Sequence, residues 1–535
     1  MAESGEVKAG AERARIARAA GLVSAMTLVS RVLGLVREVV FAALLGAGYH
    51  SDAFRIGFRI PNLLRDMFAE GALSAAFVPT YARALNDGGR EAAFRLANRV
   101  LMFLAVLLGL LVALGIVFAW PVVSALAPGF DDQAGKADLT VLLTRLMMPF
   151  LPFVSFAAVA MGMLNAEERF GIPALSPALF NAVTIAWAGA LWAMGLPPDQ
   201  VVVGWALGTL AGGLAQFLVQ VPSLRRLGWR PRADWAPRDP GLLRIAGLMA
   251  PATVGLAAVQ VNIFVNSRFA STEPGAVSWL DYAFRLLYLP IGLFGVALGT
   301  IATAGLARRA AAGDMDGLRQ TLRQSLSMLA FLTVPATVGL MALGVPVVRL
   351  LYERGKFTAE DTQATAAALF LYSFGLVGYT GVKVLAPAFY ALGRPRVPLL
   401  ASVSAVTTNL LVIWAFHARF GFRAIAVGTA LGSIVNTALL VGFFERRVGG
   451  LFGHGLFRPI VRMAVAAAAM GALSWASAAG LERLVGTRGL WAQLVTGLVP
   501  VLAGVGLYGL LTHALRVGEA EVLGRMVRDR LRRAR

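Results

Sequence analysis

Runs of about 19 or more residues without a charged side chain recur along this 535-residue chain, and they leave few folds open to it. A helix of about 20 apolar residues crosses the roughly 30 Å hydrocarbon core of a bilayer. Charged residues make up only 15% of the chain, against about 25% in soluble domains. The pattern predicts an all-α polytopic membrane protein. The twelve runs are 100–130, 146–166, 170–198, 200–224, 245–267, 286–307, 324–348, 362–382, 397–418, 424–444, 463–481 and 489–515.

The first apolar region differs from these twelve because its charges lie inside the apolar segments. It predicts two further spans, at 19–46 and 51–84, and a total of about fourteen transmembrane helices. Pro61 lies within the second of them, and we expect it to interrupt that helix.

Basic residues explain the topology better than a nucleic-acid partner does, although the net charge is +20. They gather in alternate connections, including 225–239 and the tail 516–535, whereas the intervening connections are poor in arginine or mixed. This is the positive-inside pattern. It predicts a multi-pass protein with both termini in the cytoplasm and no nucleic-acid partner. The absence of cysteine and the four scattered histidines predict no metal site and no cofactor.

Two halves of the chain repeat at an offset of 225 to 229 residues. Asp52 precedes Pro61 by nine residues, as Asp281 precedes Pro290, and Pro121 matches Pro346. Two six-helix repeats of the same orientation followed by two more helices are typical of transporters with parallel repeats. We therefore divide the chain into a cytoplasmic segment 1–18, an N-lobe 19–235, a C-lobe 236–448, a C-terminal helix pair 449–516 and a basic tail 517–535.

Charged residues within the first two spans are candidates for function, because a charge at the bilayer centre costs about 2.5 kcal/mol or more. Arg31, Arg37 and Glu38 lie in the first span, and Arg55, Arg59, Arg65, Asp66 and Glu70 lie in the second. One interpretation is internal pairing, of Arg37 with Glu38 or Asp66 and of Arg65 with Glu70, while the charges at the ends reach the membrane surface. Arg55 and Asp52, near the outer end, fit this interpretation. The other is an anion site, since arginine outnumbers the acids and guanidinium donors suit phosphate oxygens.

The second half adds two intramembrane cations, Arg285 and Lys383. Arg285 extends the candidate anion site, and Lys383 either lines the cavity or pairs with a carboxylate or carbonyls. The intramembrane amides, such as Asn409, are expected to form interhelical hydrogen bonds.

Several segments resemble the MurJ/MviN family of lipid II flippases. The most specific are Ser30-Arg31-Val32-Leu33-Gly34-Leu35-Val36-Arg37, Asp52-Ala53-Phe54, Pro61-Asn62-Leu63-Leu64-Arg65 and Phe68-Ala69-Glu70-Gly71-Ala72. Later similarities include Gly355-Lys356-Phe357-Thr358 and Lys383-Val384-Leu385-Ala386-Pro387. The chain departs from the family at Asp66, Phe284 and Tyr288, which puts the local pairing of Arg285 in question.

The resemblance implies a fourteen-helix fold of the multidrug/oligosaccharidyl-lipid/polysaccharide exporter superfamily in the bacterial inner membrane. The substrate would be lipid II, a pyrophosphate-linked peptidoglycan precursor, moved from the inner to the outer leaflet by alternating access, with membrane lipids around the protein. It places Arg31, Arg37, Arg65 and Arg285 on the substrate. Supporting residues of the cavity or its gate would be Glu38, Asp52, Arg59, Asp66, Glu70 and Lys383.

Two other functions stay open at this stage. One is a cation-coupled drug exporter, or an exporter of another polyprenyl-linked oligosaccharide, in the same superfamily. The other is a membrane scaffold that transports nothing. An enzyme is not expected, because no nucleophile and base occur together. The sequence does not set the oligomeric state, and a monomer is compatible with it.

Overall fold

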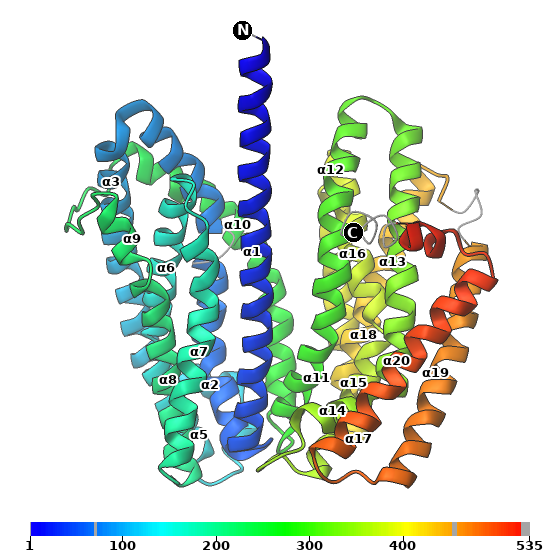
Figure 1. Ribbon diagram of the computed structural model, residues 1–535. Coiled ribbons are helices and arrows are strands. Elements are labelled where there is room, and N and C mark those ends of the chain that lie inside the picture. Colours follow the sequence, from blue (N-terminus) through cyan, green and yellow to red (C-terminus); the bar gives the residue numbers. More distant parts are fainter. Residues whose placement is uncertain (1, 69–71, 452–456, 526–535) are drawn as a thin grey trace. The chain divides into compact units, whose positions relative to one another are not determined.

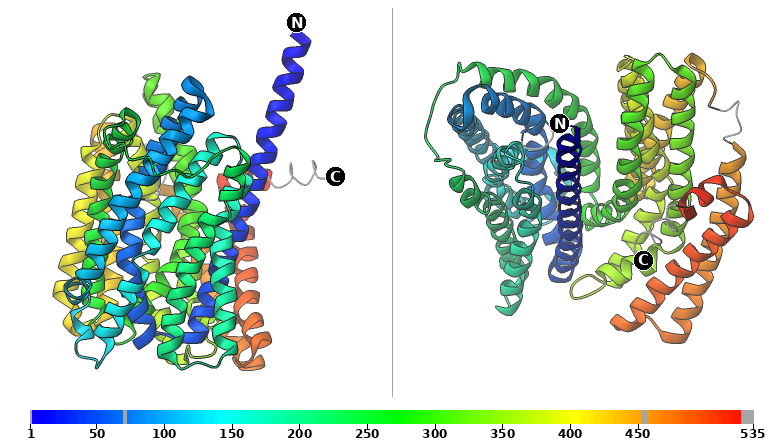
Figure 2. Two further views of the ribbon diagram at one scale, coloured as in Figure 1. Left: turned by 90° about the vertical axis from the view of Figure 1, so that its left-hand side faces the viewer. Right: turned by 45° about the horizontal axis from the view of Figure 1, so that its top comes forward.

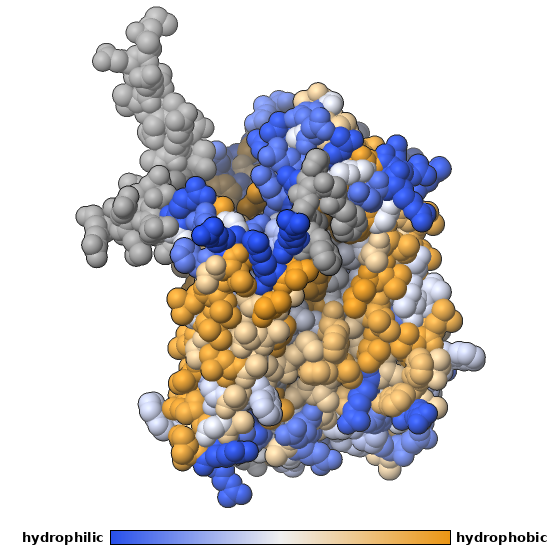
Figure 3. Space-filling view, turned by 90° about the vertical axis from the view of Figure 1, so that its right-hand side faces the viewer, coloured by the Kyte–Doolittle hydropathy of each residue, from blue (hydrophilic) through white to orange (hydrophobic). Residues whose placement is uncertain are grey.

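The computed structural model describes residues 2–68, 72–451 and 457–525, and within these ranges the chain is helical with no strand (Figure 1). Ten of the described helices are long and apolar enough to cross a membrane, or eleven if the bent pair α15 and α16 is one span. This confirms the predicted class of polytopic helical membrane protein. On the face in Figure 3, apolar residues form a broad band with hydrophilic residues gathered above and below it.

Two compact units divide the chain, and each is described by itself. Unit 1 comprises Met1–Gly275 together with Arg354–Phe357, and unit 2 comprises Ala276–Glu353 and Thr358–Arg535. The helices of unit 1 are α1 (Ala2–Leu45), α2 (Tyr49–Phe68), α3 (Ala72–Val117), α4 (Ala119–Leu126), η1 (Pro128–Phe130), α5 (Lys136–Met147), α6 (Phe150–Ala166), α7 (Gly171–Ala193), α8 (Pro198–Leu218), α9 (Val221–Arg226) and α10 (Pro240–Ala270).

Unit 2 contains the remaining helices. They are α11 (Ala276–Pro290), the π-helix η2 (Ile291–Val296), α12 (Ala297–Ala311), α13 (Met315–Ala342), α14 (Gly344–Tyr352), α15 (Ala359–Ser373), α16 (Leu376–Ala391), α17 (Arg396–Phe420), α18 (Phe422–Arg447), α19 (Phe457–Val485) and α20 (Leu490–Ala514). The C-terminal pair α19 and α20 lies side by side and packs through α19 on α13 (Figures 1 and 2).

The first apolar region forms helices as predicted, but Pro61 does not interrupt one of them. Helix α2 continues through Pro61 to Phe68, so the expected break is wrong. A proline ring removes one backbone donor and crowds the carbonyl four residues earlier, which is here that of Gly57, yet the helix is continuous across both residues.

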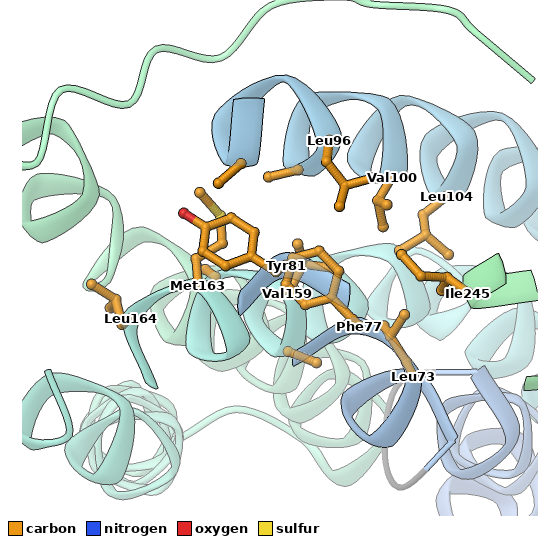
Figure 4. Packing of buried hydrophobic residues seen from close by; sticks show 14 of the residues in the cluster. Leu73, Phe77, Tyr81, Leu96, Val100, Leu104, Val159, Met163, Leu164 and Ile245 are labelled. Carbon is orange, nitrogen blue, oxygen red and sulfur yellow. The ribbon is translucent and has the colours of Figure 1, made fainter. Parts of the chain in front are cut away.

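The helical run that follows the predicted span 51–84 is broken at Gly89. Helix α3 has a non-helical residue at Gly89, with φ 68° and ψ −172°. Figure 4 shows Leu73, Phe77 and Tyr81, before this break, facing Leu96 and Val100, after it, across one buried cluster. The two parts of α3 therefore pack on each other, and the predicted span 51–84 corresponds to α2 with the first part of α3.

The charge-free run 100–130 is not one helix. Helix α3 ends at Val117, Phe118 has non-helical backbone angles, and the short helices α4 and η1 follow. A run without charge indicates burial in the membrane or in the protein, but it does not indicate where a helix ends.

The predicted repeat is present in the helices. Helices α4 to α8 of unit 1 begin 223 to 226 residues before helices α14 to α18 of unit 2. They also pack in the same pairs: α7 on α8 and α17 on α18, α6 on α8 and α16 on α18, α2 on α5 and α11 on α15. Shared pairing on this scale shows that the two halves of the chain repeat one helical arrangement, and two further helices, α19 and α20, follow it.

Helix α10 is the exception to this correspondence. By its position in the repeat, α10 corresponds to α1. Helix α1 packs on α7, whereas α10 packs on α3. Ile245 of α10 belongs to the buried cluster that contains Leu73 and Val100 (Figure 4). Packing thus divides the chain at Gly275, whereas the repeat divided it at 235. The assignment of 236–448 to one moving lobe stays a prediction.

The segment before α10 explains its place. The Trp229 indole nitrogen donates to the Asn98 side-chain oxygen at 2.9 Å, and Trp229 is buried. The Arg99 guanidinium pairs with Asp234 at 2.9 Å and with Asp239 at 2.5 Å. Because Asp239 also caps α10 through the Leu242 amide, α10 begins at a point fixed to α3.

Candidate anion site

Helices α1 and α2 bring two arginines to one carboxylate. The Arg37 Nη2 lies 2.8 Å from Glu38 Oε1, and the Arg55 Nη2 lies 3.7 Å from Glu38 Oε2. Each guanidinium also faces an aromatic ring at 5.2 Å, Arg37 that of Phe180 and Arg55 that of Phe41. The predicted pairing of Arg37 with Glu38 is therefore formed, and α2 adds a second cation to it.

Two pairs of arginines on α1 and α2 lie at different distances from the turn that joins these helices. Arg37 is eight residues before the end of α1 and Arg55 six residues after the start of α2, which is about 9–12 Å along either helix from the turn. Arg31 and Arg65 lie 14 and 16 residues from the same turn, at about 21–24 Å.

Arg31 is the most open of these side chains. It is exposed on α1, and within the described part of the chain no ion pair is recorded for it. The neighbouring backbone is fixed, because the Asn181 amide of α7 donates to the Ser30 carbonyl at 3.1 Å. Arg31 therefore presents all of its donors from a rigid helix.

Arg65 pairs with the residue that follows it. Its Nη2 and Nε lie 2.8 Å and 3.3 Å from the same Asp66 oxygen, and the two side chains are 25% and 36% exposed. Asp66 is thus a partner of Arg65, where the sequence suggested Glu70. Glu70 lies outside the described residues.

Arg59 connects α2 to α10. Its Nη1 donates to the Ser267 hydroxyl at 2.6 Å, and that hydroxyl donates in turn to the Ile263 carbonyl. Arg59 is therefore a link between two helices of unit 1.

Asp52 is fully buried and has a partner that the sequence did not indicate. The Lys136 ammonium lies 3.0 Å from Asp52 Oδ2, and both side chains have no exposed surface. The Gly275 amide donates to the same oxygen at 2.9 Å. Lys136 is the first residue of α5 and lies in the buried interior of unit 1.

In unit 2, Arg285 pairs with Asp281 one turn earlier, at 2.9 Å, and its side chain is 44% exposed. The neighbouring Phe284 packs against Tyr372 and Tyr379. The local partner of Arg285 is therefore Asp281.

Lys383 lies on α16 and is exposed. Its backbone packs against Gly299 of α12, where an added side chain would overlap the Lys383 carbonyl. Asn409 accepts a hydrogen bond from Thr429 at 3.3 Å, which joins α17 to α18 as expected of the intramembrane amides.

Two helical repeats built from apolar helices of membrane-spanning length define a transporter of the parallel-repeat class. Comparison with known proteins then gives the family. The family model described as lipid II flippase MurJ matches residues 41–492, and the chain belongs to this family. It is accordingly a multi-pass protein of the bacterial inner membrane.

Individual relatives agree with this assignment. A probable lipid II flippase MurJ of Vibrio cholerae is 36% identical over 477 residues, which cover 86% of this chain and 89% of that protein. The lipid II flippase MurJ of Burkholderia cenocepacia is 35% identical over 466 residues, with the same two shares.

Solved structures share the fold. Lipid II flippase MurJ in an inward closed conformation aligns with a TM-score of 0.73 and 25% identity, covering 92% of this chain and 99% of that one. An inward-facing multidrug transporter of the MATE family, in the MOP superfamily, aligns with a TM-score of 0.64 and 17% identity over 81% of this chain and 99% of that one. The second likeness shows the fold alone.

Proposed function

We propose that this protein binds the pyrophosphate of lipid II and carries the lipid from the inner to the outer leaflet by alternating access. The observation that supports this most directly is the set of arginines on α1 and α2, within a chain of the MurJ family. Guanidinium groups offer forked donors that match phosphate oxygens. The protein itself catalyses no reaction and binds no nucleic acid, and a monomer is sufficient for this mechanism.

Arg31, Arg37, Arg65 and Arg285 are the proposed substrate ligands. Arg31 supplies an open set of donors, whereas Arg37, Arg65 and Arg285 each lie beside a carboxylate that orients the side chain. Glu38, Asp66 and Glu70 would tune these arginines, and Asp52, Arg59 and Lys383 would support the cavity or its gate.

The proposed cycle uses the two repeats as rocking lobes, 19–235 and 236–448, with the helix pair 449–516 holding the polyprenyl tail. Both termini lie in the cytoplasm. A cell interior that is negative favours outward movement of an anion by about 2.3 kcal/mol per charge for each 100 mV. Outward movement of the bound anionic lipid is therefore the direction that the membrane potential favours.

Reconstituted vesicles test this proposal. Purified protein should move fluorescent lipid II between leaflets, and native mass spectrometry should detect lipid II bound to it. Alanine at Arg31, Arg65 or Arg285 should reduce both signals to background while membrane abundance is kept. Transport of a cationic drug without lipid II binding would favour the drug-exporter alternative, and movement of neither substrate would favour the scaffold.

A further inference from the structure

Arg55 is a buried arginine that lies outside the four proposed ligands. Its side chain is only 5% exposed, and its guanidinium lies over the Phe41 ring with Nη2 at 3.7 Å from Glu38 Oε2. Burying a guanidinium is costly unless charged or polar groups surround it. The burial of the Arg55 guanidinium therefore requires a structural or functional explanation.

The contact with the adjacent Glu38 does not by itself fix the orientation of the Arg37 side chain. Residues i and i+1 project about 100° apart on a helix, so the sequence contact between Arg37 and Glu38 does not fix either side chain. Phe180 of α7 limits the Arg37 guanidinium from one side, with its centroid at 5.2 Å.

Glu38 supplies the missing constraint because its two oxygens face different helices. Oε1 accepts from Arg37 of α1, and Oε2 faces Arg55 of α2. The carboxylate is thus held between the two helices, with a side-chain exposure of 11%. An arginine bonded to a fixed carboxylate has a fixed orientation.

We propose that Arg55 is a positioning residue that acts through Glu38 on Arg37 and so sets how the Arg37 guanidinium meets the substrate. This inference rests on the proposed function, in which Arg37 binds the pyrophosphate. Arg55 itself touches Glu38 and Phe41, and it is not assigned a contact with lipid II.

Binding of lipid II to the purified full-length protein tests the inference. Arg55→Met should weaken the apparent affinity about tenfold, because Glu38 loses the positive charge 3.7 Å from its Oε2, with membrane abundance unchanged. Arg55→Lys restores the charge and should recover part of the affinity. Arg145→Met removes an exposed arginine of α5 and serves as the matched control, with unchanged binding expected.

Combination with Arg37→Ala separates positioning from a general structural effect. Since Arg55 acts through Arg37, adding Arg55→Met to Arg37→Ala should cause no further loss of affinity. Where Arg55→Met lowers the yield, Arg55→Met with Glu38→Gln removes both charges and is compared with Glu38→Gln alone, and the two should bind equally weakly.

The outcomes are distinguishable. Unchanged affinity in Arg55→Met, or an additional loss on top of Arg37→Ala, overturns the positioning role and leaves the proposed function standing. A wild-type protein that binds no lipid II overturns the proposed function, and this inference falls with it.

Discussion

Asp52 of α2 and Lys136 of α5 form an ion pair of 3.0 Å in which both side chains are fully buried. The Lys136 ammonium lies 4.1 Å from the centroid of the Phe130 ring, and the Gly275 amide donates to the shared Asp52 oxygen. The pair thus joins α2 to α5, and the hydrogen bond from Gly275 adds the segment after α10. It accounts for the presence of two opposite charges inside unit 1.

Removal of one partner should therefore destabilise the protein more than removal of both. Lys136→Met leaves Asp52 buried without this cation, and we expect a loss of about 3–5 kcal/mol in the free energy of unfolding. Thermal unfolding of the purified protein in detergent measures the change. The double variant with Asp52→Asn should regain most of the stability. A single variant as stable as the wild type would contradict this account of the pair.

Replacement of Arg37 should separate substrate binding from folding. If Arg37 binds the pyrophosphate, both Arg37→Ala and its combination with Glu38→Ala should reach normal membrane abundance and flip no lipid II. If Arg37 only neutralises Glu38, the single variant should be poorly abundant and the double variant should flip normally. Immunoblotting of membranes together with vesicle flipping assays measures both quantities, and restored flipping in the double variant would exclude the anion role.

The cysteine-free sequence allows a direct test of topology. The positive-inside pattern places the connection 225–239 in the cytoplasm and the η1–α5 connection outside. Cysteine at Asp132 should react with an impermeant maleimide added to intact cells, whereas cysteine at Arg232 should react only after the cells are opened. The reverse pattern would invert the predicted orientation.

Gly355 should be far less tolerant of alanine than Gly393, although both have positive φ, 59° and 67°. A Cβ at Gly355 would overlap the Ala43 carbonyl oxygen, whereas a Cβ at Gly393 meets open space. Backbone strain of about 1 kcal/mol is common to both substitutions, so their difference reports packing. We expect Gly355→Ala to lower the melting temperature more and to speed hydrogen exchange at the Lys356 amide, which donates to Ala43 at 2.9 Å. Equal melting temperatures in the two variants would show that this packing contributes little.

Periodic absence of charge predicted the fold well because membrane spans are set by composition over some 20 residues. It failed at Phe118, where the helix ends within a charge-free run. The proline rule failed at Pro61, where the helix continues.

The site was only partly accessible from the sequence. Arg37 and Glu38 are adjacent, so their pairing could be predicted, but the approach of Arg55 and of Lys136 is set by helix packing. The repeat held one usable signal. Lys136 aligns at an offset of 225 with Asp361, which caps α15 and accepts a hydrogen bond from Trp279 of α11. The equivalent helix pairs α2–α5 and α11–α15 are thus each joined by a polar contact, an ion pair in the first and a hydrogen bond in the second.

The segment Arg354–Phe357 belongs to unit 1, although more than 75 residues of unit 2 precede it in the chain. Translation proceeds from the N-terminus, so the contacts of Lys356 with Ala43 form only after the ribosome has passed this segment. Unit 1 is therefore complete only after residues 276–353 of unit 2 have been synthesised, and until then the end of α1 lacks its backbone contact with Lys356.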